Sequence, residues 1–277
     1  MSAIRTLCFL PACMAVLLLA ACGGIPLSSG GGKETNPVVS IDRPMSEQPA
    51  TTEYRRNAKV HVELGTAYVE GEQLGVALDE ARHAIAYDKG YAPAHVLMGK
   101  VFALLTQYSQ AEAAFAEAVR LAPGDPEVNS EYGWYLCSRD RFSQGVQRLE
   151  AALGNPYFKN PARALGLLGF CHIRAKDYVA AERALSQSYQ RDPQNLRVIY
   201  QLAEVALRAD ALPRAREFAN ELAAKLSPGA TPESVWLSLR IERKMGNRVA
   251  ETKLANQLAR DYPASAEYQS YLQGKFE

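Results

Sequence analysis

The sequence lacks an excess of charge of either sign. Among its 277 residues, 31 Lys and Arg face 30 Asp and Glu, which gives a formal net charge of +1. A long block of like charge is missing as well. Nucleic-acid binding depends largely on contacts between basic side chains and phosphates, so this composition predicts a protein with no nucleic-acid partner.

The sequence is also poor in motifs for catalysis and metal binding. Its four histidines, His61, His83, His95 and His172, lack the two-histidine spacing of zinc proteases, and no cysteine–histidine cluster has zinc spacing. A Gly-x-Ser-x-Gly nucleophile turn is absent, and the glycines at 30–32 precede no strand. We therefore predict that the protein is not an enzyme, with no catalytic residue, metal, cofactor or small-molecule substrate.

A hydrophobic run long enough to span a membrane is missing too. The apolar stretch Leu7–Ala21 has 15 residues, whereas a spanning helix needs about 20. It runs into Leu-Ala-Ala-Cys at 19–22, which resembles the lipobox of bacterial lipoproteins. Residues 1–21 are thus predicted to be a cleaved signal, and Cys22 to be the first mature residue, carrying acyl chains. The alternative is an ordinary secretory signal beside a chance cysteine.

The residues after the lipobox indicate location and mobility. Gly23 stands where an aspartate would favour the inner membrane of a Gram-negative cell. The resemblance therefore implies an outer-membrane lipoprotein whose folded part faces the periplasm. Residues 22–51 are rich in Gly, Ser and Pro and almost free of aromatics. They predict a disordered tether with a root-mean-square span of roughly 30 Å.

From residue 52 onward an internal repeat dominates the chain. Gly65, Gly99, Gly133 and Gly169 are separated by 34, 34 and 36 residues. A small residue follows each glycine by twelve positions, at Ala77, Ala111, Gly145 and Ala181. This pattern resembles the tetratricopeptide repeat (TPR), a 34-residue helix–turn–helix whose two helices cross closely.

Two weaker copies keep the same phase to the end of the chain. Prolines such as Pro123 and Pro193 close several units, because proline cannot donate the interior hydrogen bond of a helix. We predict an all-α protein, a right-handed TPR superhelix of about six repeats over residues 52–277. The repeats are predicted to start near residues 58, 92, 126, 162, 196 and 231.

The first helices of such repeats line a concave groove. Counting from the repeat starts places an aromatic stripe of Trp134, Phe170 and Tyr200 there, with arginines beside it. Aromatic and arginine side chains are the usual hot spots of interfaces, and an apolar groove favours a peptide segment with apolar anchors. The alternative is that the aromatics only cover neighbouring helices or a terminal helix. The predicted partner-binding set is Val96, Lys100, Leu104, Ser130, Trp134, Arg163, Phe170, Arg174, Tyr200, Glu204 and Leu207.

Two cysteines remain once Cys8 and Cys13 are assigned to the signal and Cys22 to the lipid. An even pair in an oxidising compartment suggests a disulfide between Cys137 and Cys171. Both fall late in the first helices of adjacent repeats, which are neighbours in a TPR superhelix, so a bridge is geometrically reasonable. The alternative is two small buried helix residues.

Segments of repeats three and four resemble one family in particular. Asn129–Cys137 matches the pattern Asn-x-x-Tyr-Gly-x-Phe-Leu-Cys, with Tyr135 in place of the phenylalanine. Residues 155–157, 161–165 and 169–171 match further segments of the same family. These proteins are the type IV pilus biogenesis/stability lipoproteins, the pilotins of the pilus secretin.

The resemblance implies a lipid-anchored scaffold that binds the secretin subunit and promotes its localisation and multimerisation in the outer membrane. It thereby implies support for pilus assembly, twitching motility and adhesion. A general periplasmic adaptor for another envelope assembly machine is the competing interpretation. An enzyme with accessory repeats is a third, but only a short tail follows Pro263.

Overall fold

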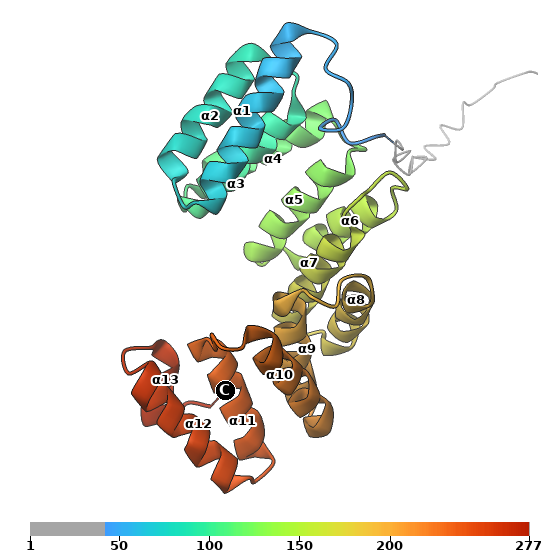
Figure 1. Ribbon diagram of the computed structural model, residues 1–277. Helices are drawn as coiled ribbons and strands as arrows, with labels where there is room; N and C mark the ends of the chain where they lie inside the picture. The colour runs from blue at the N-terminus through green and yellow to red at the C-terminus, as the bar shows by residue number, and fades with distance from the viewer. Residues whose placement is uncertain (1–41, 277) are drawn as a thin grey trace, which may run out of the picture. The chain divides into compact units, whose positions relative to one another are not determined.

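The computed structural model describes residues 42–276. The predicted signal peptide, Cys22 and most of the predicted tether therefore lie outside the described residues. Within the described range the chain forms thirteen α-helices and no β-strand (Figure 1). None of these helices is both long and apolar enough to cross a membrane.

Twelve of the helices form six helix–turn–helix pairs. The two helices of each pair pack on each other, and the odd-numbered helices of successive pairs also make contact. This is the arrangement of a TPR superhelix, which confirms the predicted fold class. The pairs are α1 (Glu53–Glu70) with α2 (Leu74–Tyr87), α3 (Ala92–Leu104) with α4 (Tyr108–Leu121), α5 (Pro126–Ser138) with α6 (Phe142–Leu153), α7 (Pro161–Arg174) with α8 (Tyr178–Arg191), α9 (Leu196–Arg208) with α10 (Leu212–Leu226), and α11 (Pro232–Lys244) with α12 (Arg248–Asp261).

The helix starts follow from local capping chemistry. At α5, the Asp125 side chain accepts hydrogen bonds from the N–H groups of Glu127 and Val128, and Pro126 occupies the first turn. At α1, the Thr52 side chain caps the helix. This helix begins at residue 53, whereas we predicted that the first repeat starts near residue 58. The first helices of the other repeats begin at 92, 126, 161, 196 and 232, close to the repeat starts that we predicted.

Every repeat turns between its two helices at a residue with positive φ. In the first five repeats this residue is not glycine, and its φ lies between 58° and 62°. In the sixth it is Gly246, with φ 75°. A left-handed residue at this point ends the first helix and turns the chain into the second. The residues of the first five turns are Glu72, Thr106, Asp140, Lys176 and Asp210.

Small residues allow the paired helices to cross closely. A Cβ atom on Gly133 would lie 2.8 Å from Cγ of Leu149 and 3.0 Å from the carbonyl oxygen of Gly145. On Gly99 it would lie 2.9 Å from the ring of Phe115. The glycine and small-residue spacing of the sequence therefore reflects steric need at the crossing of each pair.

Residues 42–51, which we had included in the predicted tether, lie against the repeats. We call residues 42–50 the strap. The Met45 N–H donates to Oδ2 of Asp125 at 2.6 Å, and the Asn155 amide donates to the Asp42 carbonyl at 2.9 Å. Met45 also packs against the buried side chains of α3 and its neighbours. The strap thus joins the start of the described chain to repeats two to four.

The last helix, α13 (Ala266–Leu272), covers the sixth repeat. It contacts α11 and α12. The Phe276 ring stacks on Trp236 with ring centroids 5.4 Å apart, and the Arg240 side chain donates to the Phe276 carbonyl at 3.0 Å. A terminal repeat has no following neighbour, so a covering segment protects apolar surface that the solenoid would otherwise expose.

Candidate binding groove

Two adjoining cavities lie along the odd-numbered helices. The first has a volume of about 240 Å³ and is lined by α1, α3, α5, α7, the strap and the loop before α7. The second has a volume of about 470 Å³ and is lined by α1, α3, α5, α7 and α9. Lys100, Glu131 and Arg163 line both cavities, so the two are continuous at these residues. We call the two cavities together the groove.

The second cavity contains the apolar part of the groove. Trp134 and Phe170 come from successive first helices, α5 and α7, and each is half-buried against the core behind it. Leu104 and Leu167 line the same cavity, and Leu104 is 45% exposed. Together these four side chains form an apolar surface of the kind against which interface anchors pack.

A buried carboxylate lies where the two cavities meet. The Arg163 guanidinium donates to Oε1 of Glu131, and the Lys100 ammonium lies 3.3 Å from Oε2. Burial alone raises the pKa of Glu131, but the charges of Lys100 and Arg163 outweigh it and hold the pKa below its ordinary value. Glu131 is therefore ionised at neutral pH and ties three successive first helices together.

Buried polar atoms without a hydrogen-bond partner gather in the groove. Within residues 42–276 these atoms are Oγ of Ser130, Oε2 of Glu131 and Oε1 of Gln201. Oε2 of Glu131 still has the Lys100 ammonium at 3.3 Å, so Ser130 and Gln201 are the clearest cases. An unpaired buried polar atom costs about 1–3 kcal/mol. A bound segment that donates hydrogen bonds to these oxygens would remove that cost.

The structure brings most of the predicted partner-binding residues together. Arg174, Tyr200 and Glu204 are not among the residues that line the groove. Leu207 lines a separate cavity with Phe276 and several basic side chains. The predicted residues that do line the groove are Val96, Lys100, Leu104, Ser130, Trp134, Arg163 and Phe170.

Tyr200 and Glu204 have structural partners inside the solenoid. Tyr200 packs against the core shared by α9, α10 and α11, as in the alternative we set out for the aromatics. The Glu204 carboxylate is buried and accepts hydrogen bonds from Arg208 and Arg240, each at 2.9 Å. These two residues therefore stabilise the contact between repeats five and six.

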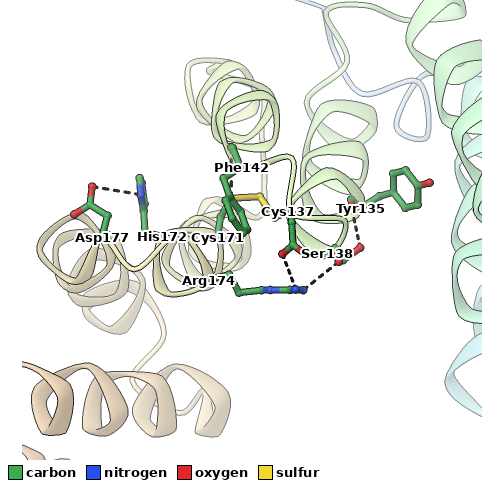
Figure 2. Close-up of a disulfide and its surroundings, with 9 residues drawn as sticks. Tyr135, Cys137, Ser138, Phe142, Cys171, His172, Arg174 and Asp177 are labelled. Carbon is green, nitrogen blue, oxygen red and sulfur yellow. Dashed lines mark hydrogen bonds and ion pairs between the residues drawn. A yellow bond between two sulfur atoms is a disulfide. The ribbon is translucent and has the colours of Figure 1, made fainter.

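Arg174 does not line the groove cavities but lies beside the disulfide (Figure 2), with its guanidinium 5.8 Å from the ring centroid of Phe170. Its guanidinium donates to Oδ1 of Asp140 at 2.7 Å and to the Ser138 carbonyl at 3.1 Å, so it bridges to the turn of repeat three. A disulfide joins Cys137 of α5 to Cys171 of α7, and both residues are fully buried. The first helices of repeats three and four, which carry Trp134 and Phe170, are thus linked covalently.

Counting repeat positions missed several residues that line the groove, among them Glu131, Arg197 and Gln201. Glu131 had a signal, because an acid on one first helix faces Lys100 and Arg163 on the helices before and after it. Opposite charges on successive repeats therefore mark a contact across helices. Arg197 and Gln201 had no comparable signal in the sequence.

Comparison with known proteins identifies similar chains. Residues 172–227 match the tetratricopeptide repeat family. The chain is 23% identical to the type IV pilus assembly protein PilF of Pseudomonas aeruginosa over 211 residues, which is 76% of this chain and 83% of that protein.

Two solved structures share the arrangement of helices. The crystal structure of PilW, described as a widely conserved type IV pilus biogenesis factor, is 24% identical with a TM-score of 0.73, covering 78% of this chain and 98% of that one. The structure of Pseudomonas aeruginosa PilF is 22% identical with a TM-score of 0.69, covering 81% of this chain and all of that one. The paired helices and these likenesses show that the chain has the TPR fold.

Proposed function

We propose that the protein is a pilotin, an outer-membrane lipoprotein scaffold that binds the subunit of the type IV pilus secretin. It promotes the localisation and multimerisation of the secretin and thereby pilus biogenesis. The acyl chains on Cys22 anchor it to the membrane, and the repeats face the periplasm. Its action is binding and placement, with no chemical step.

Three features support a role in pilus biogenesis. The similar proteins PilF and PilW are described as a type IV pilus assembly protein and a type IV pilus biogenesis factor. The lipobox-like sequence at 19–22 and the family-like segment Asn129–Cys137 lie in this chain itself. The second of these segments includes Ser130, Glu131 and Trp134, three residues of the groove.

The groove is the observation that carries the binding mechanism. Its apolar cavity suits an apolar anchor of the partner against Trp134 and Phe170. Ser130 and Gln201 line the groove with buried oxygens that lack a hydrogen-bond partner, and backbone N–H groups of an extended segment can donate to them once these side chains rotate. Arg163 and Arg197 stand at the rim and favour an acidic flank. We therefore assign to the groove an extended secretin segment with an apolar anchor and an acidic neighbour.

Replacing Trp134 with Ala tests this assignment. Loss of a hot-spot aromatic costs about 2 kcal/mol or more, so we expect the affinity for the purified secretin subunit to fall about 30-fold or more. Isothermal titration calorimetry with the full mature chain measures it. Phe170→Ala should act in the same direction, because both rings line one cavity.

Tyr54→Ala is the matched control for an aromatic outside the groove. Tyr54 lies at the start of α1 and is 68% exposed. Circular dichroism must show that all three variants keep the helical content of the wild type. Unchanged secretin binding by folded Trp134→Ala and Phe170→Ala variants would exclude the groove as the binding site. Failure of the wild type to bind secretin at all would favour the general envelope adaptor.

A further inference from the structure

Two histidines and a glutamate meet in the first repeat. His61 lies on α1, while Glu80 and His83 lie three residues apart on α2. One ligand atom from each side chain can be chosen so that all three atoms lie within 4.8 Å of one another. None of the three residues lines the groove cavities. The sequence predicted no metal site, because its histidines lack the spacing of zinc proteases and no cysteine–histidine cluster has zinc spacing.

Existing contacts hold two of these three side chains in place. Nδ1 of His61 lies 2.6 Å from Oε2 of Glu80, and the Tyr87 ring stacks on the His61 ring at 5.3 Å with an interplanar angle of 17°. The His83 ring centroid lies 5.3 Å from that of His61. His61 and Glu80 are partly buried and His83 is exposed. The Tyr87 ring and the contact with Glu80 therefore hold His61 in place, while His83 keeps the cluster open to solvent.

The ligand set matches the preferences of zinc. Two imidazoles and one carboxylate, with water in the fourth position, form a known arrangement for Zn²⁺. Ligand bonds of about 2.0–2.1 Å place neighbouring ligand atoms of a tetrahedral ion about 3.3 Å apart. His61 and Glu80 would have to separate by less than about 1 Å, and His83 would have to approach by a side-chain rotation. Imidazole ligands disfavour Mg²⁺ and Ca²⁺, which prefer oxygen.

We propose that His61, Glu80 and His83 bind Zn²⁺, or a divalent transition metal of similar preference, between α1 and α2. The ion links the two helices of the first repeat. Within residues 42–276 this repeat packs on one neighbouring repeat, the second, whereas an inner repeat packs on two. Bound zinc therefore adds a link inside a repeat that has one repeat neighbour in the described part of the chain. The proposal does not depend on secretin binding.

A zinc titration of the metal-free mature chain tests the proposal. We expect one Zn²⁺ per chain by isothermal titration calorimetry, and no binding of Mg²⁺ at the same concentration. The variants His83→Ala and Glu80→Gln should each lose at least tenfold in zinc affinity. His95→Ala is the control, since His95 lies outside the cluster and contacts the Lys89 carbonyl at 3.0 Å.

Hydrogen exchange provides a second readout at the site itself. Zinc should slow amide exchange in α1 and α2 of the wild type and of His95→Ala, but not of His83→Ala. Because His83 is exposed, its replacement is expected to leave the fold intact, which the exchange pattern of α3 to α12 will show. Absence of zinc binding by the wild type, or equal affinity in His83→Ala, would overturn the proposal.

Discussion

Glu131 is the residue that links the stability of the groove to its charge. Its carboxylate is buried between Lys100 and Arg163, and its pKa lies below the ordinary value of 4.5. A lowered pKa in the folded state means that the stabilisation is present above the unfolded value and disappears as the pH falls through the folded one. The groove therefore loses this support in acid.

The variant Glu131→Gln should show this pH dependence directly. We expect its free energy of unfolding to be about 2 kcal/mol lower than that of the wild type near neutral pH, because it loses hydrogen bonds between charged groups. In acid, once the pH has fallen through the lowered folded-state pKa of Glu131, the two proteins should converge, since the wild-type carboxyl is then protonated as well. Urea denaturation at both pH values measures the gap. A gap that stays constant with pH would show that Glu131 does not act through its charge.

At the scale of single elements, the turn residues with positive φ that are not glycine are under strain. Thr106 has φ 60° in the turn between α3 and α4, and its branched side chain disfavours this conformation. Thr106→Gly should therefore raise the free energy of unfolding by about 0.5–1 kcal/mol, after allowance for the extra freedom of the unfolded chain. Thermal or urea denaturation is sufficient to measure the change.

Gly246 provides the reciprocal variant. It occupies the same place in repeat six with φ 75°, and a Cβ atom there would meet nothing within 4 Å. Gly246→Ala therefore changes only backbone strain and should lower the free energy of unfolding by about 0.5–1 kcal/mol. Effects of equal sign in the two variants would contradict the strain argument.

The disulfide links elements of two repeats, α5 and α7. It closes a separation of 34 residues between Cys137 and Cys171, which corresponds to about 3–4 kcal/mol of stabilisation in the chain-entropy model. Reduction, or the double change to serine, should lower the unfolding free energy by that amount. Thiol labelling of the denatured, unreduced chain should leave both cysteines unmodified. Labelling of either residue under these conditions would show that the bridge is not formed.

Repeat periodicity made the elements predictable, and long-range contacts limited what else could be predicted. Gly133 and Gly145 indicated the α5–α6 crossing because only small residues fit there. The contacts of the strap could not be predicted, because the hydrogen bond that holds it joins Met45 to Asp125, 80 residues away. Its composition alone predicts a disordered tether.

Counting repeat positions locates a residue on the concave side where position alone decides exposure. Trp134 and Phe170 occupy equivalent faces of successive helices, and both line the second cavity. The same count assigned Arg174 and Glu204 to the groove. In the structure Arg174 forms an ion pair with Asp140, and Glu204 forms one with Arg240. Which charged side chains pair with one another depends on the path of the superhelix.

At the scale of the whole molecule, the strap determines where the chain leaves the repeats. Its first described residue, Asp42, is held by Asn155 at the end of repeat three, and Glu47 pairs with Lys159 at 2.9 Å. Ser46 of the strap also lines the first cavity, so the strap lies beside the proposed secretin site.

The most direct test of the account is the amount of detergent-resistant secretin multimer in the outer membrane. We would compare a deletion strain with strains complemented by the wild type, Trp134→Ala, Tyr54→Ala or Cys22→Ala. The account predicts that secretin multimers disappear on deletion while secretin monomers persist. Complementation with the wild type or with Tyr54→Ala should restore the multimers, and complementation with Trp134→Ala should not. The strain with Cys22→Ala shows whether the lipid is needed. Undiminished multimers in the deletion strain would contradict the pilotin function.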